Sequence, residues 1–122
     1  MQKKFIGLPS SDEHVAINTV IYLPTNLNIP VKGIIQVVHG MTEHMGRYDT
    51  FGEYFTNNGY TVIGNDIISH GRSKCLNSAS AIFIDNWFDA VSDILTVRDM
   101  GKKLFPDVPI FLVGFSLGSF LV

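Results

Sequence analysis

The chain has 122 residues, of which 46% are apolar and 16% are charged, and its formal net charge is -2. These proportions fit one globular domain with a hydrophobic core and argue against a disordered protein. The small net charge supplies no general attraction to nucleic acid, so no nucleic-acid partner is expected. The single cysteine, Cys75, excludes an intramolecular disulfide, and no apolar run approaches the roughly 20 residues of a membrane span. Together with an N-terminus that lacks a signal-peptide pattern, this predicts a cytoplasmic protein.

Two runs rich in Phe, Ile, Val and Thr open the chain, at residues 3–8 and 14–22, and a polar segment separates them. This pattern predicts two antiparallel strands that form a hairpin. A loop from Pro24 to Pro30 leads to a nearly continuous apolar run at residues 33–38. Such a run is typical of a strand that is buried on both faces.

The remainder alternates between helix and strand patterns, in the order helix 48–58, strand 60–64, loop 65–80, helix 85–104, strand 110–113 and the start of a helix at 119–122. The second helix has an apolar stripe that consists of Trp87, Phe88, Val91, Ile94, Leu95 and Met100. Strands that alternate with helices predict an α/β fold with a mostly parallel sheet and helices on both of its faces. Strand 110–113 is expected to leave an open sheet edge, which invites pairing with another chain.

The residues 114–118, which read G-F-S-L-G, follow the last predicted strand and match the G-x-S-x-G nucleophile elbow. In this turn the chain passes from strand to helix within one residue, which forces the serine into a strained backbone conformation. Gly114 and Gly118 are needed because side chains there would collide with neighbouring backbone. The strain exposes the hydroxyl at the carboxyl end of the sheet, where crevices of open α/β sheets lie. The pattern predicts Ser116 as a catalytic nucleophile.

A tetrahedral intermediate needs two hydrogen-bond donors, and the second normally comes from the loop after an earlier strand. His39, Gly40 and Met41 occupy that place, directly after the run 33–38. We therefore predict the backbone N–H groups of Met41 and Leu117 as the oxyanion donors. Gly40 permits a tight turn. His39 is expected to hold the loop by hydrogen bonds, and a role as catalytic base is the alternative.

Residues 39–48 read H-G-M-T-E-H-M-G-R-Y, residues 66–73 read D-I-I-S-H-G-R-S, and residues 106–119 read P-D-V-P-I-F-L-V-G-F-S-L-G-S. These segments resemble the H-G-x-G-E-H-x-G-R-Y, D-x-x-G-H-G-x-S and P-x-x-P-x-F-L-x-G-H-S-M-G signatures of monoacylglycerol lipases and bacterial lysophospholipases, within the α/β-hydrolases of the serine aminopeptidase S33 type. Their order and spacing also match. The resemblance implies that residues 1–122 are the N-terminal portion of a single α/β-hydrolase domain, truncated after the nucleophile elbow.

The resemblance further implies hydrolysis of carboxylic esters of small lipids, such as monoacylglycerol or lysophospholipid, by a Ser-His-Asp triad without metal or organic cofactor. In these enzymes the acid and then the histidine follow the serine, so both are expected beyond residue 122. The chain alone should therefore hydrolyse little or nothing. A cap, also expected beyond residue 122, would supply any peripheral membrane contact. The sequence sets no oligomeric state.

By match of position, the resemblance also assigns supporting roles near the site. Glu43, His44 and Arg47 would brace the oxyanion loop, with an ion pair between Glu43 and Arg47. Asp66 and His70 would organise the neighbouring loop. These five residues are expected to give structural support without taking part in the chemistry.

Three positions depart from the signatures. Thr42 and Ser69 stand where glycines are usual, and Phe115 replaces the usual histidine of the elbow. None of these changes removes a catalytic atom, because the oxyanion donors are backbone groups. Two alternatives to a lipid-ester hydrolase stay open: a non-catalytic remnant or binding module that keeps part of the fold, and a peptidase or acyltransferase on the same fold.

Overall fold

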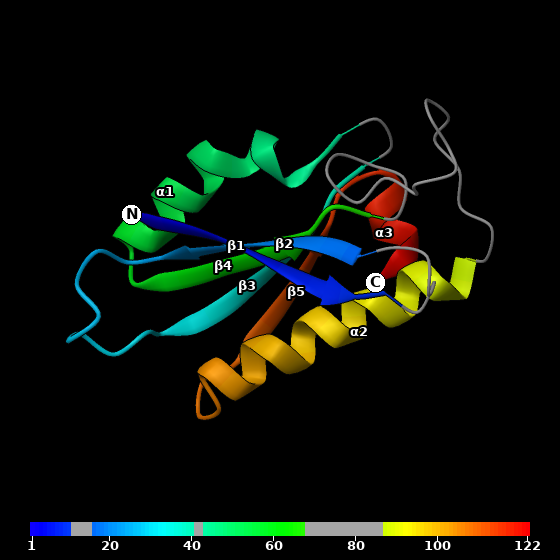
Figure 1. Cartoon of the computed structure of the whole chain (residues 1–122). Helices are drawn as coiled ribbons and strands as arrows, with labels where there is room; N and C mark the ends of the chain where they lie inside the picture. Colours follow the sequence, from blue (N-terminus) through cyan, green and yellow to red (C-terminus); the bar gives the residue numbers. More distant parts are fainter. Residues whose placement is uncertain (11–15, 41–42, 68–86) are drawn as a thin grey trace.

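A five-stranded mixed sheet forms the centre of the molecule in the computed structural model, which describes residues 1–10, 16–40, 43–67 and 87–122 (Figure 1). The strands are β1 (Gln2–Pro9), β2 (Ala16–Leu23), β3 (Gly33–Val38), β4 (Tyr60–Asn65) and β5 (Ile110–Gly114). They lie in the order β1-β2-β4-β3-β5. Strand β2 is antiparallel to both β1 and β4, whereas β3 is parallel to both β4 and β5. The predicted hairpin and the predicted parallel pairing are both confirmed.

Helices cover both faces of this sheet (Figure 1). A 3-10 turn, η1 (Met45–Tyr48), leads into α1 (Asp49–Asn57) on one face, and α2 (Trp87–Leu104) and α3 (Leu117–Leu121) lie on the other. The predicted helix 48–58 is therefore preceded by a tighter turn that the sequence did not indicate. The predicted hairpin turn and most of the predicted loop 65–80 lie outside the described residues, as does the start of helix 85–104.

Side chains that alternate along the strands divide the core into two layers. Buried residues on the α1 side are Val20, Tyr22, Ile35, Val37, Met45, Tyr48 and Val62. Buried residues on the α2 side form two clusters, Ile21, Leu23, Ile34, Ile63 and Val97 in the first, and Val38, Ile67, Ala90, Ile94 and Leu121 in the second. Every residue of β3 is buried because both of its faces are covered, which accounts for its nearly continuous apolar sequence.

Helix α2 packs on the sheet through part of the predicted stripe. Ile94 is buried, and Val91 and Met100 are half-buried against the core, as predicted. Phe88 is 73% exposed and Leu95 is 43% exposed, so these two predicted positions are wrong. At Gly101 an added Cβ would lie 2.7 Å from the Cδ1 atom of Ile63, so the helix approaches the sheet closely there.

The two edges of the sheet differ in character. The β1 edge carries Lys3 and Lys4 and ends at Pro9, which are features that discourage pairing with a further strand. In the described part of the chain β5 pairs only with β3, and it contains no charged residue. Its Phe111 and Leu112 are 50% and 42% exposed. The open edge expected at the last strand is thus present.

Tyr22 connects the hairpin to helix α1. Its hydroxyl donates to Asp49 Oδ1 at 2.6 Å, and the same oxygen accepts from Lys3 Nζ at 2.7 Å. Burial, reinforced by Asp49, raises the pKa of Tyr22, so the phenol stays protonated as a donor. Asp49 is partly desolvated, but the hydrogen bonds from Lys3 and Tyr22 hold its pKa below the usual value. The Tyr22 ring faces Gly52 of α1, where an added Cβ would lie 2.7 Å from ring carbons.

The substitution Gly52→Ala is therefore expected to destabilise the fold by ~1–3 kcal/mol, because the ring cannot retreat without losing its bond to Asp49. Alanine's better helix propensity, worth ~1 kcal/mol, offsets only part of this cost. The matched control is Gly7→Ala on β1, where a Cβ would meet nothing within 4 Å. Urea unfolding followed by circular dichroism gives both free energies. Equal stability of the two variants would show that the ring gives way.

Candidate active site

Ser116 lies at the turn between β5 and α3, at the carboxyl end of the strand. Its backbone angles are φ 52° and ψ -114°, and no other non-glycine residue in the described ranges has a positive φ. L-residues with a Cβ rarely adopt such angles, because the Cβ crowds the backbone. The strained conformation predicted from the G-x-S-x-G pattern is therefore present, and the serine is exposed.

The elbow rests directly on the end of β3. A Cβ at Gly118 would collide with the carbonyl oxygen of Val38, and a Cβ at Gly114 would lie 2.7 Å from the carbonyl oxygen of Gly118. The N–H of Phe115 donates to the same Val38 oxygen at 3.0 Å. Because these obstacles are backbone atoms, they cannot move aside as a flexible side chain would. Glycine is thus required at both flanking positions, as the sequence indicated.

The loop after β3 lies against the elbow. An added Cβ at Gly40 would be 3.3 Å from both Ser116 Cβ and the carbonyl oxygen of Phe115, and 2.7 Å from Glu43 Oε2. The loop at Gly40 therefore lies so close to Ser116 that a side chain there would press against the serine. This closeness is what an oxyanion loop needs if a carbonyl group is to fit between its donors and the serine hydroxyl.

Of the two candidate oxyanion donors, the structure describes Leu117 but not Met41. Leu117 begins α3, so its N–H has no carbonyl partner within that helix. Met41 lies outside the described residues, as does His70. The N–H of Gly40 donates to Glu43 Oε2 at 2.8 Å and is therefore not available to an oxyanion.

His39 is fully buried, and both of its ring nitrogens are engaged. Its Nε2 accepts a hydrogen bond from the N–H of Ile67 at 2.9 Å, so the ring proton resides on Nδ1. Nδ1 lies 2.7 Å from the carbonyl oxygen of Gly40 and donates to it. These bonds agree with the loop-holding role expected for His39 and argue against its alternative role as a catalytic base.

Asp66 and His44 support the turn that follows the loop. Asp66 is 2% exposed, and its two carboxylate oxygens accept from the Met45 N–H at 2.7 Å and from Asn18 Nδ2 at 3.0 Å. His44 Nδ1 accepts from the Gly46 N–H at 3.1 Å and so caps η1. Asp66 therefore ties β2 and the end of β4 to η1, an arrangement consistent with the organising role expected of it.

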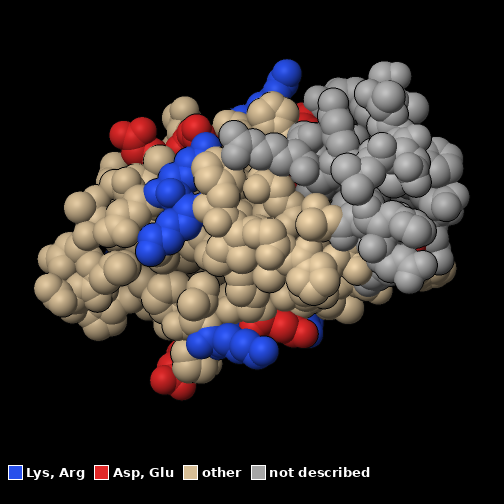
Figure 2. Space-filling model, viewed as in Figure 1, with Lys and Arg blue, Asp and Glu red and all other residues tan. Residues whose placement is uncertain are grey.

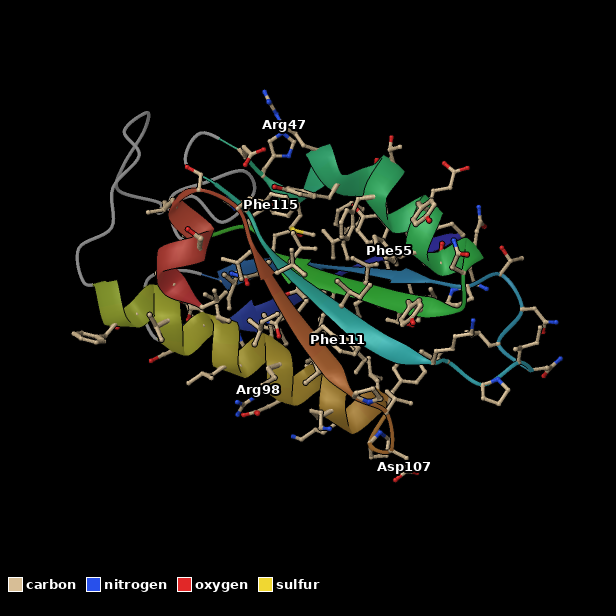
Figure 3. The ribbon with its side chains drawn as sticks, turned by 180° about the vertical axis from the view of Figure 1, so that it is seen from behind. Arg47, Phe55, Arg98, Asp107, Phe111 and Phe115 are labelled. Atoms are coloured by element: carbon tan, nitrogen blue, oxygen red, sulfur yellow. The ribbon has the colours of Figure 1, made fainter. Side chains whose placement is uncertain are left out.

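Glu43 is held by Tyr48 and not by Arg47, its expected partner. The hydroxyl of Tyr48 lies 3.3 Å from Glu43 Oε2 and donates to it. Burial, followed by the negative charge of Glu43, raises the pKa of Tyr48 to about 12, so this donor keeps its proton. The ion pair expected between Glu43 and Arg47 is not among those formed by the described residues, and Figure 3 shows Arg47 extending away from the site. The four-residue spacing favours such a pair only within a helix, and Glu43 precedes η1.

The sequence analysis gave no supporting role to Tyr48 or Asn18. Tyr48 lies inside the signature segment 39–48, and this position could have indicated a role in the site. Asn18 carries no comparable signal, because its bond to Asp66 joins residues 48 positions apart and depends on the pairing of β2 with β4.

One face of the molecule shows how the charged side chains are distributed. On the face seen in Figure 2, positive and negative side chains alternate in small groups, and no large patch carries a single sign. Among the described residues no three His, Cys, Asp or Glu side chains gather as a metal site would require. None of the described helices is both long and apolar enough to span a membrane.

Comparison with known proteins gives the family. Residues 29–122 match the family described as serine aminopeptidase, S33. The chain belongs to this family. A monoglyceride lipase homolog of Monkeypox virus and the monoglyceride lipase of Mus musculus are 35% and 36% identical to it over 88 residues. Each alignment covers 72% of this S33 chain but only 30% and 28% of the two relatives, so the chain spans less than a third of their length.

Solved structures confirm the α/β-hydrolase fold. A thermostable carboxyl esterase from Bacillus coagulans, solved with glycerol, matches with a TM-score of 0.85 and 28% identity. A lipase in its open form matches with a TM-score of 0.86 and 26% identity. The matches cover 99% and 98% of this chain and 38% of each of those chains. The S33 chain thus has the architecture of part of an α/β-hydrolase domain.

The strain at Ser116 has a measurable effect on stability. Glycine relieves a positive φ, whereas alanine keeps the Cβ that causes the strain, so Ser116→Gly is expected to be more stable than Ser116→Ala by ~1 kcal/mol. This difference already allows for the greater freedom of glycine in the unfolded chain. Urea unfolding of the two variants measures it. A Ser116→Ala variant as stable as Ser116→Gly would indicate an unstrained turn.

Proposed function

We propose that the chain carries the nucleophile and the oxyanion loop of a serine hydrolase that acts on carboxylic esters, with Ser116 as the nucleophile. The observation that carries the proposal is the strained φ of 52° at an exposed serine, beside a loop where a Cβ added at Gly40 would lie 3.3 Å from Ser116 Cβ. Such a conformation costs ~1–3 kcal/mol, and it is retained where a site needs the side chain at that point. Membership of the S33 family supports the same conclusion.

In the proposed reaction, Ser116 Oγ attacks the carbonyl carbon of the ester while a base removes the hydroxyl proton. The N–H groups of Leu117 and Met41 stabilise the negative charge that develops on the carbonyl oxygen. The tetrahedral intermediate then collapses, and the leaving alcohol departs with the proton from the base. Water hydrolyses the resulting acyl-enzyme by the same route in reverse, which restores the serine.

We do not assign this base to His39 or His44, the two histidines that the structure describes. Both ring nitrogens of His39 are hydrogen-bonded, and Nδ1 of His44 caps η1. We therefore assign the acid and the base to positions after residue 122, in the order serine, acid, histidine that this fold uses. A serine hydroxyl without a neighbouring base is a weak nucleophile, so residues 1–122 alone are proposed to be nearly inactive.

Lipid esters are the proposed substrate class, with monoacylglycerols or lysophospholipids foremost. The support is that two relatives at 35% and 36% identity are a monoglyceride lipase homolog and a monoglyceride lipase. The likeness to a carboxyl esterase agrees with an ester as the bond that is cleaved. Peptide hydrolysis, which the family description names, is the competing activity.

Labelling with a fluorophosphonate probe tests the nucleophile. We expect the product of the natural reading frame, expressed through its stop codon, to react with the probe, and Ser116→Ala to abolish the reaction. Residues 1–122 alone should label at least ~100-fold more slowly, because a missing base costs several orders of magnitude. Mass spectrometry of the labelled peptide locates the adduct.

The variant Ser119→Ala is the matched control, because Ser119 is an exposed serine three residues along the same turn whose hydroxyl donates only to the backbone carbonyl oxygen of Ser116, at 2.6 Å. This variant keeps the Ser116 hydroxyl, so it should still react with the probe, whereas Ser116→Ala should not. An adduct on a residue other than Ser116, or a folded gene product that does not react, would contradict the proposal and favour a non-catalytic binding module. Faster turnover of an aminoacyl anilide than of a monoacylglycerol would instead favour the peptidase.

A further inference from the structure

We propose that Phe115 is a positioning residue that holds the oxyanion loop in place through Tyr48 and Glu43. The inference rests on the proposed function, because the position of this loop affects catalysis only if Ser116 is the nucleophile. Phe115 is the residue before Ser116 and lies at the end of β5, beside the start of α1 (Figure 3). It stands where the related signatures have histidine, so its contacts belong to this chain in particular.

Three aromatic rings meet at this point. The ring centroids of Phe115 and Tyr48 are 5.5 Å apart, those of Tyr48 and Phe51 are 6.1 Å apart, and those of Phe51 and Phe115 are 6.5 Å apart. Among these three rings, the pairs Tyr48–Phe51 and Phe51–Phe115 are edge-to-face, with interplanar angles of 83° and 89°. Such pairs stabilise beyond their buried area and restrict the orientation of each ring. Tyr48 is therefore fixed between helix α1 and the elbow, and it is only 8% exposed.

The fixed ring aims its hydroxyl at the carboxylate of Glu43. Glu43 Oε2 accepts from the Tyr48 hydroxyl at 3.3 Å and from the Gly40 N–H at 2.8 Å. The backbone of Glu43 closes the same turn, because its N–H donates to the carbonyl oxygen of Gly40 at 3.3 Å. The Glu43 carboxylate thus orients the peptide group that contains the Gly40 N–H, and the Tyr48 hydroxyl orients that carboxylate.

These contacts join the two halves of the site. The next N–H along the chain, that of Met41, belongs to the peptide group that begins at the Gly40 carbonyl, so the backbone angles of Gly40 determine where this donor points. The chain of contacts therefore runs from the residue before the nucleophile, through Tyr48 and Glu43, to the residue before the proposed donor.

Amide hydrogen exchange of the 122-residue chain tests the coupling without any enzymatic activity. In Phe115→Ala the Gly40 N–H is expected to exchange about 3- to 10-fold faster than in the parent, because the loop opens more often once the ring contact is lost. Phe115→Tyr keeps the ring and should restore protection to within about 2-fold. The N–H of Val37, in the buried strand β3, reports global unfolding and should not change.

The matched control is Phe111→Ala. Phe111 is also an exposed phenylalanine, but it lies within β5, four residues earlier in the chain and away from the aromatic contact with Tyr48 (Figure 3). Its removal should leave exchange at Gly40 unchanged.

A double-mutant cycle separates positioning from general stabilisation. If Phe115 acts through the Tyr48 hydroxyl, Phe115→Ala should add nothing at Gly40 once Tyr48→Phe has removed that hydroxyl. Additive effects of the two substitutions would overturn the proposal. Unchanged exchange in Phe115→Ala would also overturn it. If Phe115→Ala fails to fold, Phe115→Leu replaces it in the cycle, and additive effects on exchange at the Gly40 N–H would again overturn the proposal.

Kinetics of the natural gene product supply the second readout. Phe115→Ala is expected to lower kcat for ester hydrolysis about 10-fold and to change KM less than 2-fold, because the oxyanion interaction strengthens in the transition state. A change confined to KM would contradict the positioning role. Absence of probe labelling at Ser116 would defeat the proposed function, whereas the exchange result at Gly40 would stand or fall by itself.

Discussion

The contact between Gly118 and the carbonyl oxygen of Val38 constrains the whole site. Parallel pairing places Val38 opposite Gly114, so the ends of β3 and β5 meet at one point of the sheet. The chain leaving β5 must turn there without a side chain at Gly118, and the strain of that turn is taken up at Ser116. Because the loop after β3 starts at the same point, its Gly40 is brought against the serine. The geometry of the site thus follows from two strand ends that are adjacent and a turn that only glycine can make.

The sequence predicted those parts of the fold that depend on local pattern. The apolar run 33–38 predicted the bounds of β3, and the G-x-S-x-G spacing predicted the strained backbone of Ser116. The sequence-based predictions were wrong where tertiary packing determines the environment of a side chain. Within the predicted stripe of α2, Ile94 is buried whereas Phe88 is 73% exposed, because an apolar pattern does not show which of its positions faces the sheet. The expected partner of Glu43 was wrong because spacing along the chain does not reveal that a tyrosine and a backbone amide compete for the same carboxylate oxygen.

Support for the oxyanion loop comes mainly from hydrogen bonds to its backbone. His39 binds the Gly40 carbonyl, Glu43 binds the Gly40 N–H, and Asp66 binds the N–H of Met45 where η1 begins. A buried backbone group without a partner costs about as much as a lost hydrogen bond, so each of these side chains stabilises one particular backbone conformation. These ionisable residues of the signature segments therefore fix the backbone geometry of the loop beside Ser116.

The two edges of the sheet differ in how readily they could pair with a further strand. On the β1 side, Lys3 and Lys4 make the edge costly to dehydrate, and Pro9 lacks an N–H for a ladder. On the β5 side the edge is uncharged and flanked by the half-exposed rings and branches of Phe111 and Leu112. A further strand, whether of the same polypeptide or of another, would therefore join at β5, next to the strand that carries Ser116. Whatever joins there would lie beside the strand that leads into the elbow, so pairing at this edge and the surroundings of Ser116 are structurally linked.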